Sequence, residues 1–117
     1  MILNLFRYVE NTQTFAAGET IFTAGTPGRE MYVVIEGSVD IRVCNKTLDV
    51  AGPVGIFGEM ALIDFSARSA TAIAKDDCTL APVDEKQFLH MVERSALFAL
   101  NVMQILAGRL RRMDAML

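Results

Sequence analysis

Short β-prone segments separated by turn residues fill the first two thirds of the chain, and this pattern most constrains the fold. Between Ser38 and Cys44, valine or isoleucine alternates with a charged residue, as in a strand with one buried face. Gly and Pro clusters mark the turns between segments. Strands this short and evenly spaced favour a small antiparallel barrel or jelly roll. The predicted strands are Thr14–Ala17, Thr20–Thr23, Met31–Glu36, Ser38–Cys44, Thr47–Ala51, Ser69–Ala74 and Thr79–Val83.

After residue 83 the hydrophobic period changes to that of helices. Asp84, with Gln87 three residues on, predicts a capped helix over Glu85–Glu93. Ser95 predicts the cap of a second helix that runs to the end of the chain. That helix carries a heptad-like seam, which packs against the barrel, against a partner in a homodimer through 96–117, or against each with one half. The seam consists of Ala96, Ala99, Met103, Leu106, Leu110, Met113 and Leu117.

Composition limits the classes of function. The chain has 117 residues, 52% of them hydrophobic, which predicts a single domain with a real core. A net charge of −3 excludes the overall basic field of a nucleic-acid-binding protein. The last three arginines, Arg109, Arg111 and Arg112, first indicate a solvated helix terminus that complements the helix dipole. We therefore expect no direct nucleic-acid binding by this chain.

The reactive residue types are too few for an enzyme. Cys44 and Cys78 lie in apolar strand-like segments and indicate buried free thiols of a reducing compartment. His90 is the single histidine, so the chain cannot supply a two-histidine metal site. No Ser-His-Asp or Cys-His set with a plausible separate acid, base and orienter can be assembled either. No apolar run approaches a membrane span and no signal peptide is evident, so we expect a cytoplasmic protein. The sequence predicts no catalytic residues, no metal and no cofactor.

The segment 57–70 contains the candidate ligand-binding residues. Glu59 opens a short helical turn whose first N–H groups, at Met60 and Ala61, are free to bind an anion, and Gly58 allows close approach to the backbone. Nine residues later, Arg68 offers a planar fork for phosphate oxygens. Either charged residue alone also fits a structural role, as a helix-terminal charge or a surface ion pair. Together they predict a site for a sugar joined to a phosphate, formed by Phe57, Gly58, Glu59, Met60, Ala61, Arg68, Ser69 and Ala70.

Three motifs resemble the cyclic nucleotide-binding domain family of catabolite-activator-type regulators, kinase regulatory subunits and nucleotide-gated channels. Residues 15–25 are similar to the opening strand pair of that family, 31–37 to its central hairpin, and 57–63 with 67–71 to its phosphate-binding cassette. The resemblance implies a mainly β fold with flanking helices, a double-stranded β-helix with a short cassette helix and two C-terminal helices. It also implies that Glu59 binds the ribose 2′-hydroxyl and Arg68 the cyclic phosphate. Cyclic AMP is the family default, and cyclic GMP remains open.

The chain departs from the family pattern at three places. Ala67 stands where many relatives have proline, the expected N-terminal helix is short at 2–10, and no effector segment follows the last helix. We expect one domain over 1–117, with a helical lead-in over 1–13, a barrel over 14–83 and C-terminal helices over 84–117. Leu106, Arg109, Leu110 and Met113 are the candidates for a lid over the base.

Four hypotheses follow. The first is a cyclic-nucleotide sensor that signals through its last helix, and the second is a ligand-free barrel that serves as an interaction or dimerisation module. A metal-dependent barrel enzyme of the cupin type is the third, against which the single histidine argues. The fourth is that the chain is the sensory piece of a larger protein, whose effector lies elsewhere.

Overall fold

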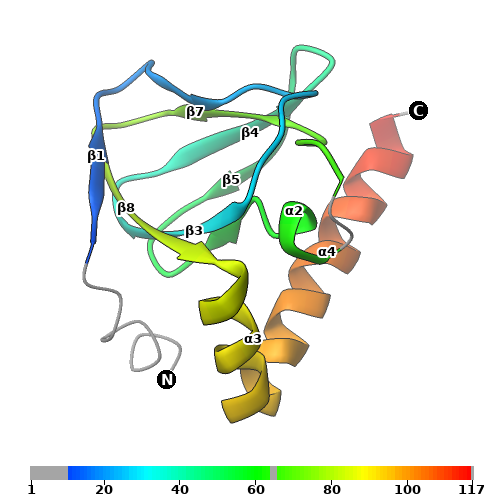
Figure 1. Ribbon diagram of the computed structural model, residues 1–117. Coiled ribbons are helices and arrows are strands. Elements are labelled where there is room, and N and C mark those ends of the chain that lie inside the picture. Colours follow the sequence, from blue (N-terminus) through cyan, green and yellow to red (C-terminus); the bar gives the residue numbers. More distant parts are fainter. Residues whose placement is uncertain (1–10, 64–65, 117) are drawn as a thin grey trace.

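Two antiparallel sheets and a pair of C-terminal helices make up the structure, a computed structural model that describes residues 11–63 and 66–116 (Figure 1). Each sheet has four strands, in the orders β1-β8-β3-β6 and β2-β7-β4-β5. The first sheet contains β1 (Gln13–Phe15), β8 (Cys78–Asp84), β3 (Glu30–Glu36) and β6 (Ile56–Phe57). The second contains β2 (Thr20–Phe22), β7 (Thr71–Ala74), β4 (Val39–Val43) and β5 (Lys46–Ala51). This is the predicted jelly-roll arrangement.

Strand β3 is the centre of the core because it is buried on both faces. Tyr32 and Val34 belong to the cluster between the two sheets, whereas Met31 and Val33 belong to the cluster beneath the helices. Side chains alternate across a strand, so these two pairs must point to opposite faces. The sheet of β3 therefore forms a layer with the second sheet on one side and the helices on the other.

Helices α3 (Glu85–Arg94) and α4 (Ala96–Met116) form the predicted C-terminal pair. Asp84 and Gln87 make the expected capping box, with reciprocal bonds of 2.8 and 2.9 Å. The Ser95 hydroxyl accepts from the Phe98 N–H at 3.1 Å and caps α4. Figure 1 shows α4 leaving α3 and rising along the barrel past the short helix α2 (Met60–Ile63). This course brings the second half of α4 beside the cassette.

The heptad-like seam does not coincide with the side chains that α4 buries most deeply. Phe98 and Val102 are the buried side chains of α4, and neither belongs to the predicted seam. Met103 and Leu110 of the seam are 60% and 63% exposed. Leu106 of the seam packs against the core beneath the helices, so the seam packs on the rest of the chain only in part. The alternative in which the seam packs against a partner stays a prediction, and Leu117 lies outside the described residues.

Several smaller expectations need correction. Strand β6 was not predicted, because a two-residue strand carries too little pattern to detect, and β7 begins two residues later than expected. Gln13 already belongs to β1, one residue before the predicted start of the barrel. Cys44 is exposed in the β4–β5 turn with a positive φ of 53°, whereas Cys78 is buried as predicted. The predicted helix over 2–10 lies outside the described residues.

None of the helices in the described part of the chain has the length and apolar character needed to cross a membrane.

Candidate functional site

A cavity of about 230 Å³ lies between the barrel wall, the cassette and α4. All eight residues that the sequence predicted for the site lie on its lining, in two runs, 57–61 and 68–70. Three barrel residues that were not predicted complete the wall: Phe22, Ile41 and Leu48. The alternation in β4 had already placed Ile41 on a buried face, so part of this wall could have been inferred. Four residues of α4 close the cavity, and they are the lid candidates Leu106, Arg109, Leu110 and Met113.

The start of the cassette brings its backbone close to Arg68. Gly58 has a φ of +81°, a conformation that side chains rarely adopt, and an added Cβ there would lie 2.9 Å from Nη1 of Arg68. The carbonyl of Glu59 then accepts from the amides of Leu62 and Ile63, at 3.0 and 3.2 Å, which starts α2. The first amides of such a turn, at Met60 and Ala61, have no partner within the helix. The positive φ favours glycine at position 58, and a Cβ there would also crowd the Arg68 guanidinium.

Arg68 is buried, 8% exposed, and is held by carbonyl oxygens. Its Nη1 donates to Glu30 at 2.7 Å and to Gly58 at 3.1 Å, and its guanidinium carbon lies 4.1 Å from the centre of the Phe22 ring. Burial lowers the pKa of Arg68 from its ordinary value, an effect that the nearby Tyr32 and carboxylates oppose. Its Nε is buried without a hydrogen-bond partner. The cation therefore lies in an apolar setting, and its Nε could donate a further hydrogen bond.

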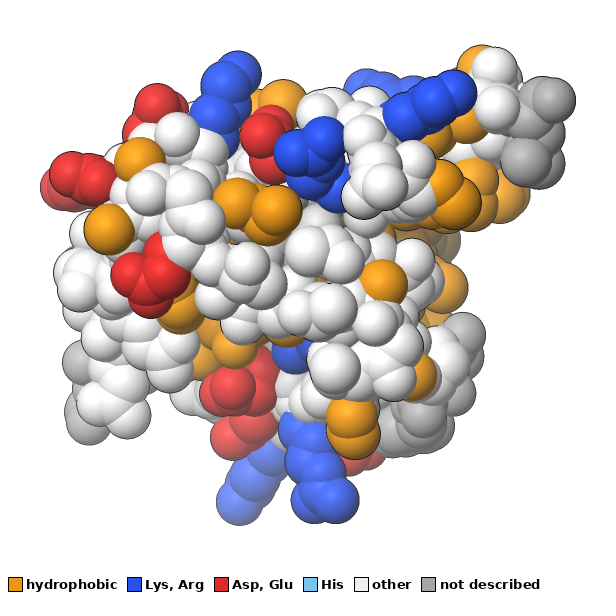
Figure 2. Space-filling model, turned by 90° about the horizontal axis from the view of Figure 1, so that it is seen from above, with side chains coloured by type: hydrophobic (Ala, Val, Ile, Leu, Met, Phe, Trp, Pro, Cys, Tyr) orange, Lys and Arg blue, Asp and Glu red, His pale blue; other side chains and the backbone are white. Residues whose placement is uncertain are grey.

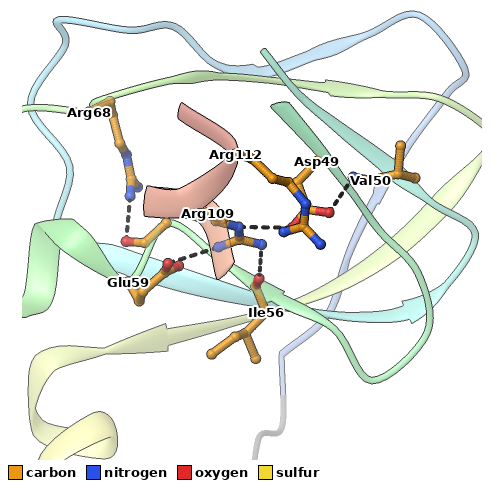
Figure 3. Close-up of polar contacts among 8 residues, drawn as sticks. Asp49, Val50, Ile56, Glu59, Arg68, Arg109 and Arg112 are labelled. Atoms are coloured by element: carbon orange, nitrogen blue, oxygen red, sulfur yellow. Dashed lines mark hydrogen bonds and ion pairs between the residues drawn. The ribbon is translucent and has the colours of Figure 1, made fainter. Parts of the chain in front are cut away.

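Glu59 is the most buried charged residue described, at 2% exposure. Its Oε1 accepts from Nη1 of Arg109 at 2.8 Å, while its Oε2 is buried with no partner. The other two nitrogens of Arg109 donate to Asp49 at 3.1 Å and to the carbonyl of Ile56 at 2.6 Å (Figure 3). One side chain of α4 thus connects the helix with the cassette, β5 and β6.

The sequence predicted the place of Arg109 in the site only in part. It was a lid candidate, but the first interpretation of a solvated helix terminus is wrong for it, because its side chain is 12% exposed. That interpretation holds better for Arg112, which is 53% exposed and 3.6 Å from Asp49. The pair with Glu59 joins residues 50 positions apart, which no local spacing reveals.

The two buried charges of the cavity, Glu59 and Arg68, do not pair with each other. The bonds of Arg68 run to carbonyls, and the partner of Glu59 comes from α4. Buried charges that keep unpartnered atoms are costly, so their persistence beside a cavity points to a ligand that supplies the missing partners. A ligand that supplied them would carry an acceptor for Arg68 and a hydrogen-bond donor for Glu59. Among the described residues no cluster of three or more His, Cys, Asp or Glu could hold a metal ion.

Comparison with known proteins places this chain in a family. The profile of the cyclic nucleotide-binding domain matches residues 12–95, and the chain belongs to that family. Over 105 residues it is 35% identical to the cyclic AMP receptor protein of Thermus thermophilus, which covers 86% of this chain and 49% of the relative.

Solved structures agree on the fold. The catabolite activator protein of Thermus thermophilus superposes with a TM-score of 0.80 at 33% identity, covering 97% of this chain and 56% of that one. The cAMP-bound form of the EAL enzyme Bd1971 matches with a TM-score of 0.67 at 33% identity, over 90% of this chain and 29% of that one. This chain therefore spans about half the length of the receptor and activator relatives and less of the EAL enzyme.

Proposed function

We propose that this chain is a regulatory, non-catalytic domain that binds a cyclic nucleotide in the cavity between the cassette and α4. Cyclic AMP is the first expectation and cyclic GMP the second, in keeping with relatives named for cyclic AMP. The observation that carries the proposal is the pair of buried charges, Glu59 and Arg68, which face one cavity, do not pair with each other and keep unpartnered atoms.

The phosphate is assigned to Arg68. A cyclic phosphate carries one negative charge, which needs a fixed cation and several N–H donors once it is out of water. Arg68 supplies the cation, and Ser69 adds a hydroxyl and an amide on the same lining. The amides at the start of α2 supply the remaining donors. The tethering of Arg68 to Glu30 and Gly58 fixes the guanidinium before the ligand arrives, which reduces the entropy lost on binding.

The ribose is assigned to Glu59. A carboxylate beside a phosphate must face a donor, and the 2′-hydroxyl of the ribose is such a donor. The free Oε2 of Glu59 can accept it while Oε1 keeps its bond with Arg109. A ligand without this hydroxyl leaves the buried oxygen without a partner, and it therefore binds more weakly.

We assign the relay of ligand occupancy to helix α4, which is connected to the site through Arg109. Ligand pockets usually measure about 300–1,000 Å³, and this cavity of about 230 Å³ is smaller, so a bound nucleotide requires the apolar lid residues Leu106, Leu110 and Met113 to move outward around the Arg109 contact. Arg109 ties that lid to Glu59, Asp49 and Ile56, so the position of α4 depends on what Glu59 binds. The relay is then a population shift between two positions of α4.

We propose that the signal passes from α4 to a second copy or to a partner protein, in the cytoplasm. The exposed apolar side chains Leu97, Leu100, Met103 and Leu110 of α4 support a homodimer through 96–117. Figure 2 shows apolar side chains gathered on the flank of the end of α4, beside Lys and Arg side chains. The same stripe favours the second candidate function, a ligand-free barrel that acts as a dimerisation module.

The test is a calorimetric titration of the chain with cyclic AMP, before and after Arg68→Ala. Losing hydrogen bonds to a charged group costs about 1.5–3 kcal/mol, so the variant should bind about 10- to 150-fold more weakly. Arg94→Ala is the matched control, since Arg94 is an exposed residue of α3 away from the cavity lining. Equal affinity of all three proteins would refute the assignment of Arg68. No binding by folded protein, together with a stable dimer in light scattering, would favour the second candidate.

A further inference from the structure

The cavity contains few groups that could read a base by hydrogen bonding. Of its described lining residues, four have polar side chains: Glu59, Arg68, Ser69 and Arg109. Arg68 and Ser69 are adjacent in the chain, so both lie where the phosphate is assigned, and Glu59 is assigned to the ribose. Arg109 is therefore the one polar group of the lid that remains for the base.

Each of the three nitrogens of Arg109 already donates a hydrogen bond. Its Nε, Nη1 and Nη2 donate to Asp49, Glu59 and the carbonyl of Ile56, all within 3.1 Å (Figure 3). Turning the guanidinium toward a base edge would put these bonds at risk, and losing the bond to Glu59 or to Ile56 would leave a buried acceptor with one partner fewer, which costs free energy. The same bonds keep the side chain directed at the cassette and at β5, away from the rest of the lid.

The remaining lining is apolar and includes the aromatic rings of Phe22 and Phe57. Ile41 and Leu48 come from the barrel, and Leu106, Leu110 and Met113 come from α4. Such a surface packs against the face of any purine through apolar contact. Leu110 lines the cavity and is nevertheless 63% exposed, so the cavity opens to solvent beside it. The polar edge of a base on this side therefore keeps its water, whichever groups it carries.

We infer that this chain selects the cyclic ribose phosphate and not the base, and that it takes cyclic purine nucleotides with little discrimination between adenine and guanine. The inference rests on the proposed function and narrows it. Sites built to hydrogen-bond a particular group reject analogues by about 10⁴–10⁵-fold, whereas apolar pockets discriminate by about 10–200-fold for a whole methylene. With equal purine faces and a hydrated edge, the affinities for cyclic AMP and cyclic GMP should differ by less than about tenfold.

The first experiment is calorimetry of the full chain with cyclic AMP, cyclic GMP and cyclic IMP, which lacks the exocyclic amines. Three affinities within about tenfold support the inference. A larger ratio between any two overturns it but leaves the proposed function standing. No binding of any of the three refutes the proposed function itself, so the two failures are distinguishable.

Variants test which surface reads the base. Met113→Ala should weaken cyclic AMP and cyclic GMP by the same factor, because it removes apolar contact from both. Met103→Ala is the matched control, a methionine of the same helix that is 60% exposed and outside the lining, and it should change neither affinity. Ser69→Ala should also change both affinities alike. A loss confined to cyclic GMP in Ser69→Ala would show that the hydroxyl reads guanine, and it would overturn the inference.

Discussion

The bond between Arg109 and Glu59 supports a sharp stability prediction. Replacing Arg109 with methionine keeps the apolar stem but removes the guanidinium and its three hydrogen bonds. Glu59, 2% exposed and with Oε2 already unpartnered, would then be a buried charge with no partner at all. Breaking a buried ion pair from one side costs about 3–5 kcal/mol. Losing the bond to Asp49 adds little to this cost, because Asp49 is 22% exposed and keeps its ion pair with Arg112 at 3.6 Å. We therefore expect Arg109→Met to lower the free energy of unfolding by about 3–5 kcal/mol.

A second substitution should restore part of that loss. Adding Glu59→Gln removes the stranded charge while keeping the shape of the side chain, so the double variant should be more stable than Arg109→Met by about 1.5 kcal/mol or more. Urea unfolding followed by circular dichroism measures all the variants without adding salt. Arg112→Met is the matched control on the same helix, and with its side chain 53% exposed it should cost about 0–1 kcal/mol. A loss below about 1 kcal/mol for Arg109→Met, or a double variant less stable than it, would refute the reasoning.

Three further predictions concern the barrel. A thiol reagent should label the exposed Cys44 in the native protein and should label Cys78 only on unfolding. Cys78 is buried, and burial and the nearby Asp77 raise the pKa of its thiol. Rapid labelling of both cysteines in the native protein would contradict the structure. Burial also raises the pKa of Tyr32, so protonated Tyr32 and Cys78 stabilise the folded state. This stability is fully present below the pKa values of the unfolded chain and is lost as the pH rises through those of the folded protein. The urea midpoint should therefore fall above about pH 9, and a midpoint that stays constant up to about pH 11 would contradict this prediction. Gly28→Ala should cost about 1–3 kcal/mol and weaken cyclic AMP binding, because its Cβ would overlap the guanidinium of Arg68, whereas Gly52→Ala, whose Cβ meets no atom within 4 Å, should leave binding unchanged.

Local pattern was enough to predict most of the fold. The alternation in β4, the capping box of α3 and the serine cap of α4 are short-range features, and each appears in the structure as expected. Strand β6 was missed because its two residues pair with β3 only after the chain has folded. The burial of Phe98 and Val102 was not predicted, because the heptad-like seam runs through other positions of α4.

The candidate site, too, could be predicted from the sequence only in part. The cassette residues are close in sequence, so their spacing predicted that they line one cavity, and all of them do. Arg109 comes from 50 positions beyond Glu59, and its burial depends on how α4 crosses the barrel. Nothing in the neighbourhood of Arg109 in the sequence distinguishes it from the more exposed Arg112. The tertiary course of α4 was therefore needed to find the residue that joins lid and cassette.

The central claim is that the cavity binds a cyclic nucleotide through Arg68 and Glu59. The most direct test is calorimetry of the purified chain, free of carried-over ligand, with cyclic AMP and with 2′-deoxy cyclic AMP. The account predicts saturable binding of cyclic AMP, weakened about 10- to 150-fold in the deoxy analogue, because the free Oε2 of Glu59 then loses its donor. Equal binding of the two ligands would contradict the role of Glu59, and no heat with either one from folded protein would contradict the claim as a whole.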